Sequence, residues 1–88
     1  MKTNNIVPKL SELREAIDIL LKYGDTEYPT YCWEDELEIL VNPNNISKED
    51  LDRLKELHFV PAGLGEYELP HLVSKVFGNC IAIKNSNN

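Results

Sequence analysis

Two stretches of the chain carry apolar residues at the three- and four-residue steps of an amphipathic helix. The first, residues 8–23, begins with a proline and is followed by Gly24, a residue suited to a left-handed helix terminator. The second, residues 48–57, follows Ser47, which together with Asp50 resembles a capping box with the shorter acid at its third position. The pattern therefore predicts two helices, each burying one face.

Residues 31–41 alternate between apolar and acidic side chains, which is the pattern of a half-buried strand. As one continuous strand this segment places Glu34, Glu36 and Glu38 together on an acidic outer face. Trp33 falls on the opposite face, where core packing is its expected role. The asparagines and proline that follow predict a turn.

The last third of the chain carries shorter signals. Residues 59–61 predict an extended segment, and residues 66–69 predict a strand that pairs back on it after a glycine turn. Residues 70–77 fit a strand or a short helix, and their valine and phenylalanine content favours the strand over 72–77. The expected fold is α+β, with two helices packed on one face of a small, mainly antiparallel sheet of three to four strands.

Length and composition indicate one small domain. A chain of 88 residues closes a single hydrophobic core, with frayed ends expected at residues 1–6 and 84–88. No apolar run approaches the roughly 20 residues that cross a bilayer, and the first residues lack the pattern of a signal peptide. Cys32 and Cys80 are too few for a disulfide framework, so free thiols in a reducing compartment are expected. These features predict a cytoplasmic protein that does not bind membranes.

The distribution of charge adds a partner class to this picture. The net charge is −6, and residues 24–46 contain six acidic side chains and no lysine or arginine. Such a one-sign region attracts basic protein surfaces and repels phosphate backbones, so direct nucleic-acid binding is not expected. The alternative is that these carboxylates only keep a small protein soluble.

Aromatic residues precede the acidic face. Tyr28 and Tyr31 flank Pro29 at the approach to the strand, and tyrosine is enriched at the centres of protein interfaces. Asp35 alternates to the other face and no glycine loop accompanies the acids, so no metal site is expected. The candidate partner-binding residues are Glu34, Glu36, Glu38, Tyr28 and Tyr31.

Thiols and imidazoles are the remaining reactive groups. Cys32, Cys80, His58 and His71 are the residue types of a zinc site or of a thiol nucleophile with its base, but they are far apart in sequence. The chain also lacks phosphate-binding glycine loops, a nucleophile elbow and a zinc-protease motif. We expect no cofactor and no enzymatic activity; a weak enzyme using Cys80 and His71 is a third interpretation.

Several short motifs follow one another in a characteristic order. They are Tyr-Pro-Thr at 28–30, Asn-Pro at 42–43, Ser-Lys-Glu-Asp at 47–50 and Phe-Gly-Asn-Cys at 77–80. This order resembles a group of small, uncharacterised proteins encoded by bacteriophages, and the resemblance implies a phage or prophage origin without an activity. Three positions depart from that pattern: Glu34 stands where the family has histidine, His58 where it has glycine, and Asn79 where it has serine. A metal or catalytic role that depends on the family's histidine is therefore not implied here.

Taken together, these features predict a non-enzymatic phage accessory protein that inhibits a bacterial host process, such as CRISPR defence, by presenting its acidic face to a basic protein surface. The alternative is a protein that binds or sequesters a small signal nucleotide, in a pocket lined by Trp33, Tyr31 and residues 77–80. Leu40 on the acidic side, or an unpaired strand edge, leaves a homodimer open.

Overall fold

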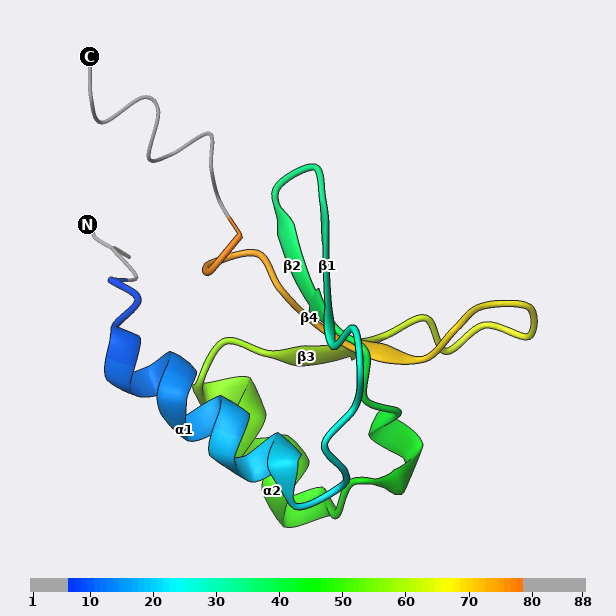
Figure 1. Cartoon of the computed structure of the whole chain (residues 1–88), viewed down its shortest axis with the longest axis horizontal. Helices are drawn as coiled ribbons and strands as arrows, with labels where there is room; N and C mark the ends of the chain where they lie inside the picture. The colour runs from blue at the N-terminus through cyan, green and yellow to red at the C-terminus, as the bar shows by residue number, and fades with distance from the viewer. Residues whose placement is uncertain (1–6, 79–88) are drawn as a thin grey trace.

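The chain folds into helices on one side of a small antiparallel sheet, which confirms the expected α+β class (Figure 1). The computed structural model describes residues 7–78. Within this range the elements are α1 (Leu10–Leu21), β1 (Thr30–Trp33), β2 (Glu36–Ile39), the 3-10 turn η1 (Pro43–Asn45), α2 (Lys48–Glu56), β3 (Val60–Ala62) and β4 (His71–Ser74). The four strands of the described range lie in the order β1-β2-β4-β3, and every neighbouring pair is antiparallel.

Both predicted helices are confirmed, each slightly shorter than expected. Helix α1 begins at Leu10, two residues after the proline that was predicted inside its first turn, and the Glu12 carboxylate accepts a hydrogen bond from the Lys9 N–H at 3.0 Å. Helix α2 begins after Ser47, whose hydroxyl accepts from the Asp50 N–H at 3.1 Å. A side-chain acceptor at this position satisfies one of the N–H groups that a helix start leaves unpaired.

Helix α2 ends in a turn that glycine usually completes. The His58 N–H donates to the Lys55 carbonyl at 3.0 Å, and the Phe59 N–H donates to the Leu54 carbonyl at 2.8 Å, as in a Schellman motif. His58 has a φ of 77° there, a conformation that costs an L-residue roughly 1–2 kcal/mol. Its Nε2 lies 3.2 Å from Glu12 Oε1, so His58 also links the end of α2 to α1.

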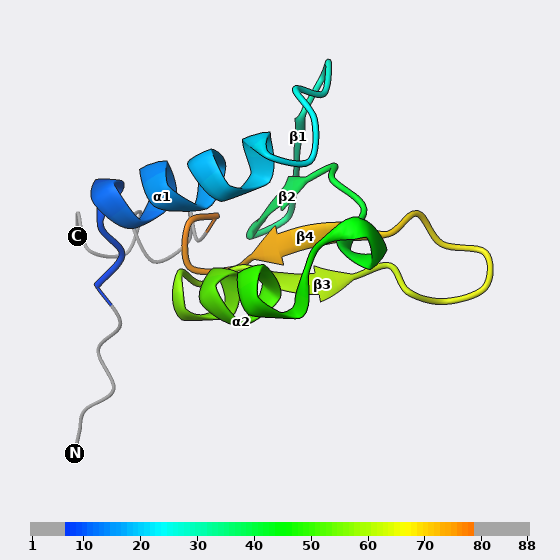
Figure 2. The ribbon, with the colours of Figure 1, turned by 90° about the horizontal axis from the view of Figure 1, so that it is seen from below.

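The hydrophobic core lies between the sheet and the two helices. Ile39 and Leu72 face each other across β2 and β4 and present the apolar side of the sheet to the helices. In Figure 2, seen from the helix side, α2 is drawn in front of β3, and α1 runs alongside α2. The buried residues of this core are Ala16, Leu20, Ile39, Val41, Ile46, Leu54, Leu57, Phe59 and Leu72.

The prediction of one continuous strand at residues 31–41 is wrong. The chain reverses at Glu34 and Asp35, so that β1 and β2 form a hairpin in which Trp33 pairs with Glu36 and Tyr31 pairs with Glu38. A single strand of that length would extend well past β4, which pairs with only three residues of β2. Reversal lets the two short segments satisfy each other's backbone N–H and C=O groups instead.

The end of the described chain also differs from its expected pairing. The partner of β3 is β4, so residues 66–69 lie in the connecting loop and the predicted strand there is wrong. The strand expected at 72–77 is confirmed in its first part and stops at Ser74, whose hydroxyl accepts from the Phe77 N–H at 3.1 Å. Gly78 passes so close to the backbone of β2 that a Cβ there would clash.

A polar cluster joins the end of α1 to the start of α2. The Tyr23 hydroxyl donates to the Asp50 carboxylate and accepts from the Ser47 N–H at 3.2 Å. Lys22 Nζ lies 2.8 Å from Asp50 Oδ2. The side chain of Asp50 thus holds α1 rather than closing the reciprocal half of the predicted capping box.

Acid should loosen this junction. The Lys22 ammonium and then the Tyr23 hydroxyl hold the pKa of Asp50 below its ordinary value. A depressed pKa contributes stability that is fully present above the unfolded value of about 3.9 and is lost as the pH falls through the folded value. We expect the melting temperature of the wild type to fall below about pH 4, and Asp50→Asn to lack part of that fall. Thermal unfolding followed by circular dichroism from pH 2 to 7 measures both.

The control is Asp52→Asn, because Asp52 makes only an exposed ion pair with Lys48 within α2. This variant should keep the acid dependence of the wild type. An Asp50→Asn profile that parallels the wild-type profile at every pH would contradict the assignment.

Candidate functional site

The β1–β2 hairpin projects away from the helices (Figure 1). The strand pairing puts aromatic and acidic side chains on one of its faces. Trp33 stands opposite Glu36 and Tyr31 stands opposite Glu38, and partners in an antiparallel pair lie on the same side of the sheet. Tyr31 and Trp33 are 51% and 55% exposed as whole residues. We call these four side chains, which point away from the core, the hairpin face.

Trp33 was expected in the core, and the structure contradicts that expectation. In a continuous strand Trp33 would share a side with Leu37, four residues later. The two-residue turn places it opposite Glu36 instead, and Leu37 opposite Cys32. An exposed tryptophan was therefore missed, because no Asn-Gly or Asp-Gly dipeptide marks the turn in the sequence.

A basic or imidazole side chain lies near each of the two carboxylates of β2. Glu36 Oε2 lies 4.0 Å from Lys75 Nζ, and Glu38 Oε1 lies 3.6 Å from His71 Nε2. The side chain of Glu36 is 32% exposed and that of Glu38 is 17% exposed, next to the buried Val73. These carboxylates are therefore less accessible than those of a fully solvated acidic strand.

The structure brings together three of the five predicted binding residues. Tyr31, Glu36 and Glu38 share the hairpin face, whereas Glu34 lies in the turn at its tip and Tyr28 lies before β1. Glu34 and Tyr28 both have positive φ, at 55° and 50°, and both side chains are exposed. Non-glycine residues held in this region cost energy and gather at binding sites, so these two positions frame the hairpin as a candidate recognition element.

An open apolar groove lies on the other side of the hairpin, between it and α1. It has a volume of about 270 Å³, and Ile17, Leu21, Thr30, Leu37 and Asp25 are among the residues that line it. Its lining contains no basic side chain. It therefore suits aliphatic groups and offers no positive charge to a nucleotide phosphate.

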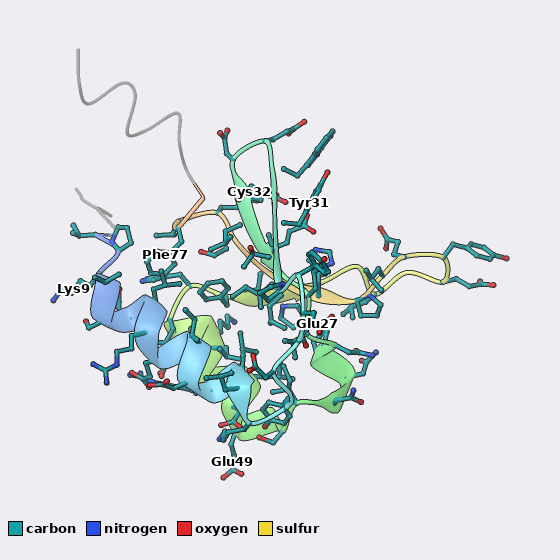
Figure 3. All side chains as sticks on the ribbon, in the orientation of Figure 1. Lys9, Glu27, Tyr31, Cys32, Glu49 and Phe77 are labelled. Atoms are coloured by element: carbon teal, nitrogen blue, oxygen red, sulfur yellow. The ribbon has the colours of Figure 1, made fainter. Side chains whose placement is uncertain are left out.

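Of the residues assigned to the nucleotide alternative, none that the structure describes lines the groove. Tyr31 and Trp33 lie on the hairpin face and do not line the groove. Phe77 stacks on the buried Phe59 with ring centres 5.7 Å apart, away from the hairpin residues labelled in Figure 3. Positions 79 and 80 are outside the described residues.

Thiol and imidazole groups show no shared site in the described part of the chain. Cys32 is exposed on β1, and His71 Nδ1 lies 2.8 Å from the Leu69 carbonyl oxygen. Cys80, its proposed catalytic partner, lies outside the described residues. Across residues 7–78 no three histidine, cysteine or acidic side chains gather closely enough to hold a metal ion. Within the same range, no helix has the length and apolar character needed to span a membrane.

A scan of protein-family models found no match to the chain, and searches of curated proteins and of solved structures found no similar protein. The resemblance to phage proteins remains a prediction based on the motifs in residues 28–80. The candidate site is therefore defined by its own geometry.

Glycine should suit the hairpin turn better than the residue now there. Glu34 occupies its first central position with a φ of 55°, where a two-residue turn of this kind normally has glycine. Glu34→Gly removes the conformational cost of positive φ, about 1–2 kcal/mol, but glycine loses more chain entropy on folding. The net result should be a variant more stable by up to about 1 kcal/mol. Urea unfolding monitored by tryptophan fluorescence measures this.

Asp35→Gly is the matched control, since Asp35 is the other turn residue and has no positive φ. It should be neutral or destabilising. Equal effects of the two substitutions would show that the strain does not lie at Glu34.

Proposed function

We propose that this chain is a non-enzymatic binding protein that attaches through the hairpin face to a basic surface of another protein. In this proposal it is a bacteriophage product that inhibits a process of the bacterial host, such as CRISPR defence. The phage origin rests on the motif order in residues 28–80, and the binding mode rests on the hairpin.

The pairing of each exposed aromatic ring with a carboxylate is the observation that carries the proposal. The hairpin face contains two adjacent pairs, each of one ring and one carboxylate: Trp33 with Glu36, and Tyr31 with Glu38. An arginine or lysine that stacks on such a ring gains cation–π attraction while it pairs with the acid beside it. Aromatic side chains are also the commonest residues at the energetic centres of interfaces.

The surrounding charge supports the same partner class. No lysine or arginine occurs in residues 24–46, so the charged side chains of the hairpin and of both its approaches are all acidic, and Lys75, after β4, lies 4.0 Å from Glu36. A field of this kind speeds the encounter with a basic surface and weakens as salt screens it. The chemistry of rings and carboxylates, which binds cations without transferring a group, fits a binding role.

Removing the charges of the hairpin should weaken binding. In the variant Glu34→Gln, Glu36→Gln, Glu38→Gln the shapes are kept, and glutamine at the half-buried Glu38 avoids placing an ammonium beside His71. With each ion pair contributing about 0.2–1 kcal/mol, retention of a basic partner should fall about tenfold at low salt. The tagged protein and the variant are compared by pull-down from bacterial lysate at low and high salt, with mass spectrometry and then a direct affinity measurement on the purified partner.

A control variant carries the same charge change elsewhere: Asp18→Asn, Asp52→Asn, Glu66→Gln, all exposed and all outside β1, β2 and their turn. It should bind like the wild type. Equal weakening by both triple variants, or by neither, would contradict the proposed surface.

The aromatic half of the face is tested separately. Trp33→Ala should cost the complex about 2 kcal/mol, roughly thirtyfold in affinity, if Trp33 is a central contact. The ring is half exposed in the free protein, so its loss should change the melting temperature little. Tyr67→Ala, at an exposed ring in the β3–β4 loop, is the control and should leave affinity unchanged. An unchanged affinity for Trp33→Ala would remove the ring from the proposal.

A further inference from the structure

Strand β1 forms an outer edge of the sheet, and half of its backbone groups point outward. The Leu40 N–H donates to the Pro29 carbonyl at 2.8 Å, which marks 29 and 40 as a hydrogen-bonded pair. Because such pairs alternate along an antiparallel ladder, Tyr31 also bonds to β2, whereas Thr30 and Cys32 direct their N–H and C=O groups away from it. All four residues of β1 are exposed, and no strand within residues 7–78 pairs with this outer side.

The two edges of the sheet differ in how they are protected. Strand β3, at the other edge, has three residues and contains Pro61. Proline, lysine and short length are devices that prevent an edge from pairing with another chain. Strand β1 has no proline, lysine or arginine, so it is the edge that can accept a further strand.

The two sides of β1 would present different chemistry to an added strand. On one side lies the hairpin face, with Tyr31 and Trp33 nearest the edge and the carboxylates of β2 behind them. On the other side Thr30 lies at the apolar groove, which the exposed side chains of Ile17 and Leu21 also line. Side chains of an added strand alternate between these two sides.

We propose that the β1 edge takes an extended segment of the partner as a fifth strand, with arginine or lysine at every second position and aliphatic residues between them. The proposal rests on the proposed function, whose hairpin face it uses, and on charge complementarity. Neighbouring strands lie about 4.8 Å apart, so β2 would be about 10 Å from the added strand. Long basic side chains that cross the two rings can reach the carboxylates there, and the aliphatic residues enter the groove.

A synthetic peptide of eight alternating arginine and valine residues, blocked at both ends, is the probe. Its binding is followed by the fluorescence of Trp33, with a peptide of the same composition in two blocks as the control for charge alone. Backbone N-methylation of either all the arginines or all the valines gives two further peptides. Only one of these sets directs its N–H groups toward β1, so one peptide should lose about tenfold or more in affinity and the other should bind within threefold of the parent.

The protein is altered at the matching position. Cys32→Pro removes an outward N–H and leaves the ladder to β2 intact, whereas Cys32→Thr keeps that N–H and is the control. The proline variant should bind the alternating peptide about tenfold more weakly than the threonine variant. Should the proline variant fail to fold, which circular dichroism detects, the N-methylated peptides decide the question.

Equal effects of the two methylated peptides, or equal binding of the alternating and block peptides, would overturn strand addition. Failure of strand addition is distinct from failure of the proposed function. If the protein does not bind the alternating peptide but retains a basic protein from lysate in a salt-sensitive way, the function is supported and strand addition at β1 is rejected. Sedimentation could also detect a dimer of the chain. A dimer that is lost in the Cys32→Pro variant but is not dissociated by the peptide would assign the edge to a second copy of the chain and also reject the proposal.

Discussion

Antiparallel pairing across the turn at Glu34 and Asp35 determines which side chains the sheet exposes. Paired residues share a side, so the reversal moves Trp33 from the expected core side to the side of the acids. The same reversal makes β1 an edge and leaves Thr30, on its core side, beside the open apolar groove. The hairpin face, the β1 edge and the groove thus follow from one change of chain direction.

Stability and recognition are separated in this small domain. The helices cover one side of the sheet, and polar contacts join them or their ends, among them Asp50 with the end of α1, Arg53 with Glu15, and His58 with Glu12. None of these contacts involves the hairpin. Its exposed rings can therefore be changed with little expected cost to the core, which is why the hairpin is suited to carry a binding surface.

The local sequence signals for the helices are confirmed in the tertiary structure. Ser47 caps α2 as the sequence indicated, and Gly24 has positive φ after α1. His58 shows the limit of such signals, because the C-terminal turn of α2 forms without the glycine by which it could have been predicted. The partner of its ring, Glu12, is distant in sequence and was not predictable from local pattern.

The sequence by itself determined the α+β class, the two amphipathic helices and the acidic character of residues 24–46, because periodicity and charge are local properties. It also placed Glu36 and Glu38 on one side of the sheet, through strand alternation that holds on either reading of the segment. Tyr31 falls on the opposite side of a continuous strand and joins them only through the reversal. Only the tertiary structure decided that Trp33 joins them and that β1 is an edge. Those features depend on strand pairing between distant backbone groups, and a run of alternating residues does not reveal where it will fold back on itself.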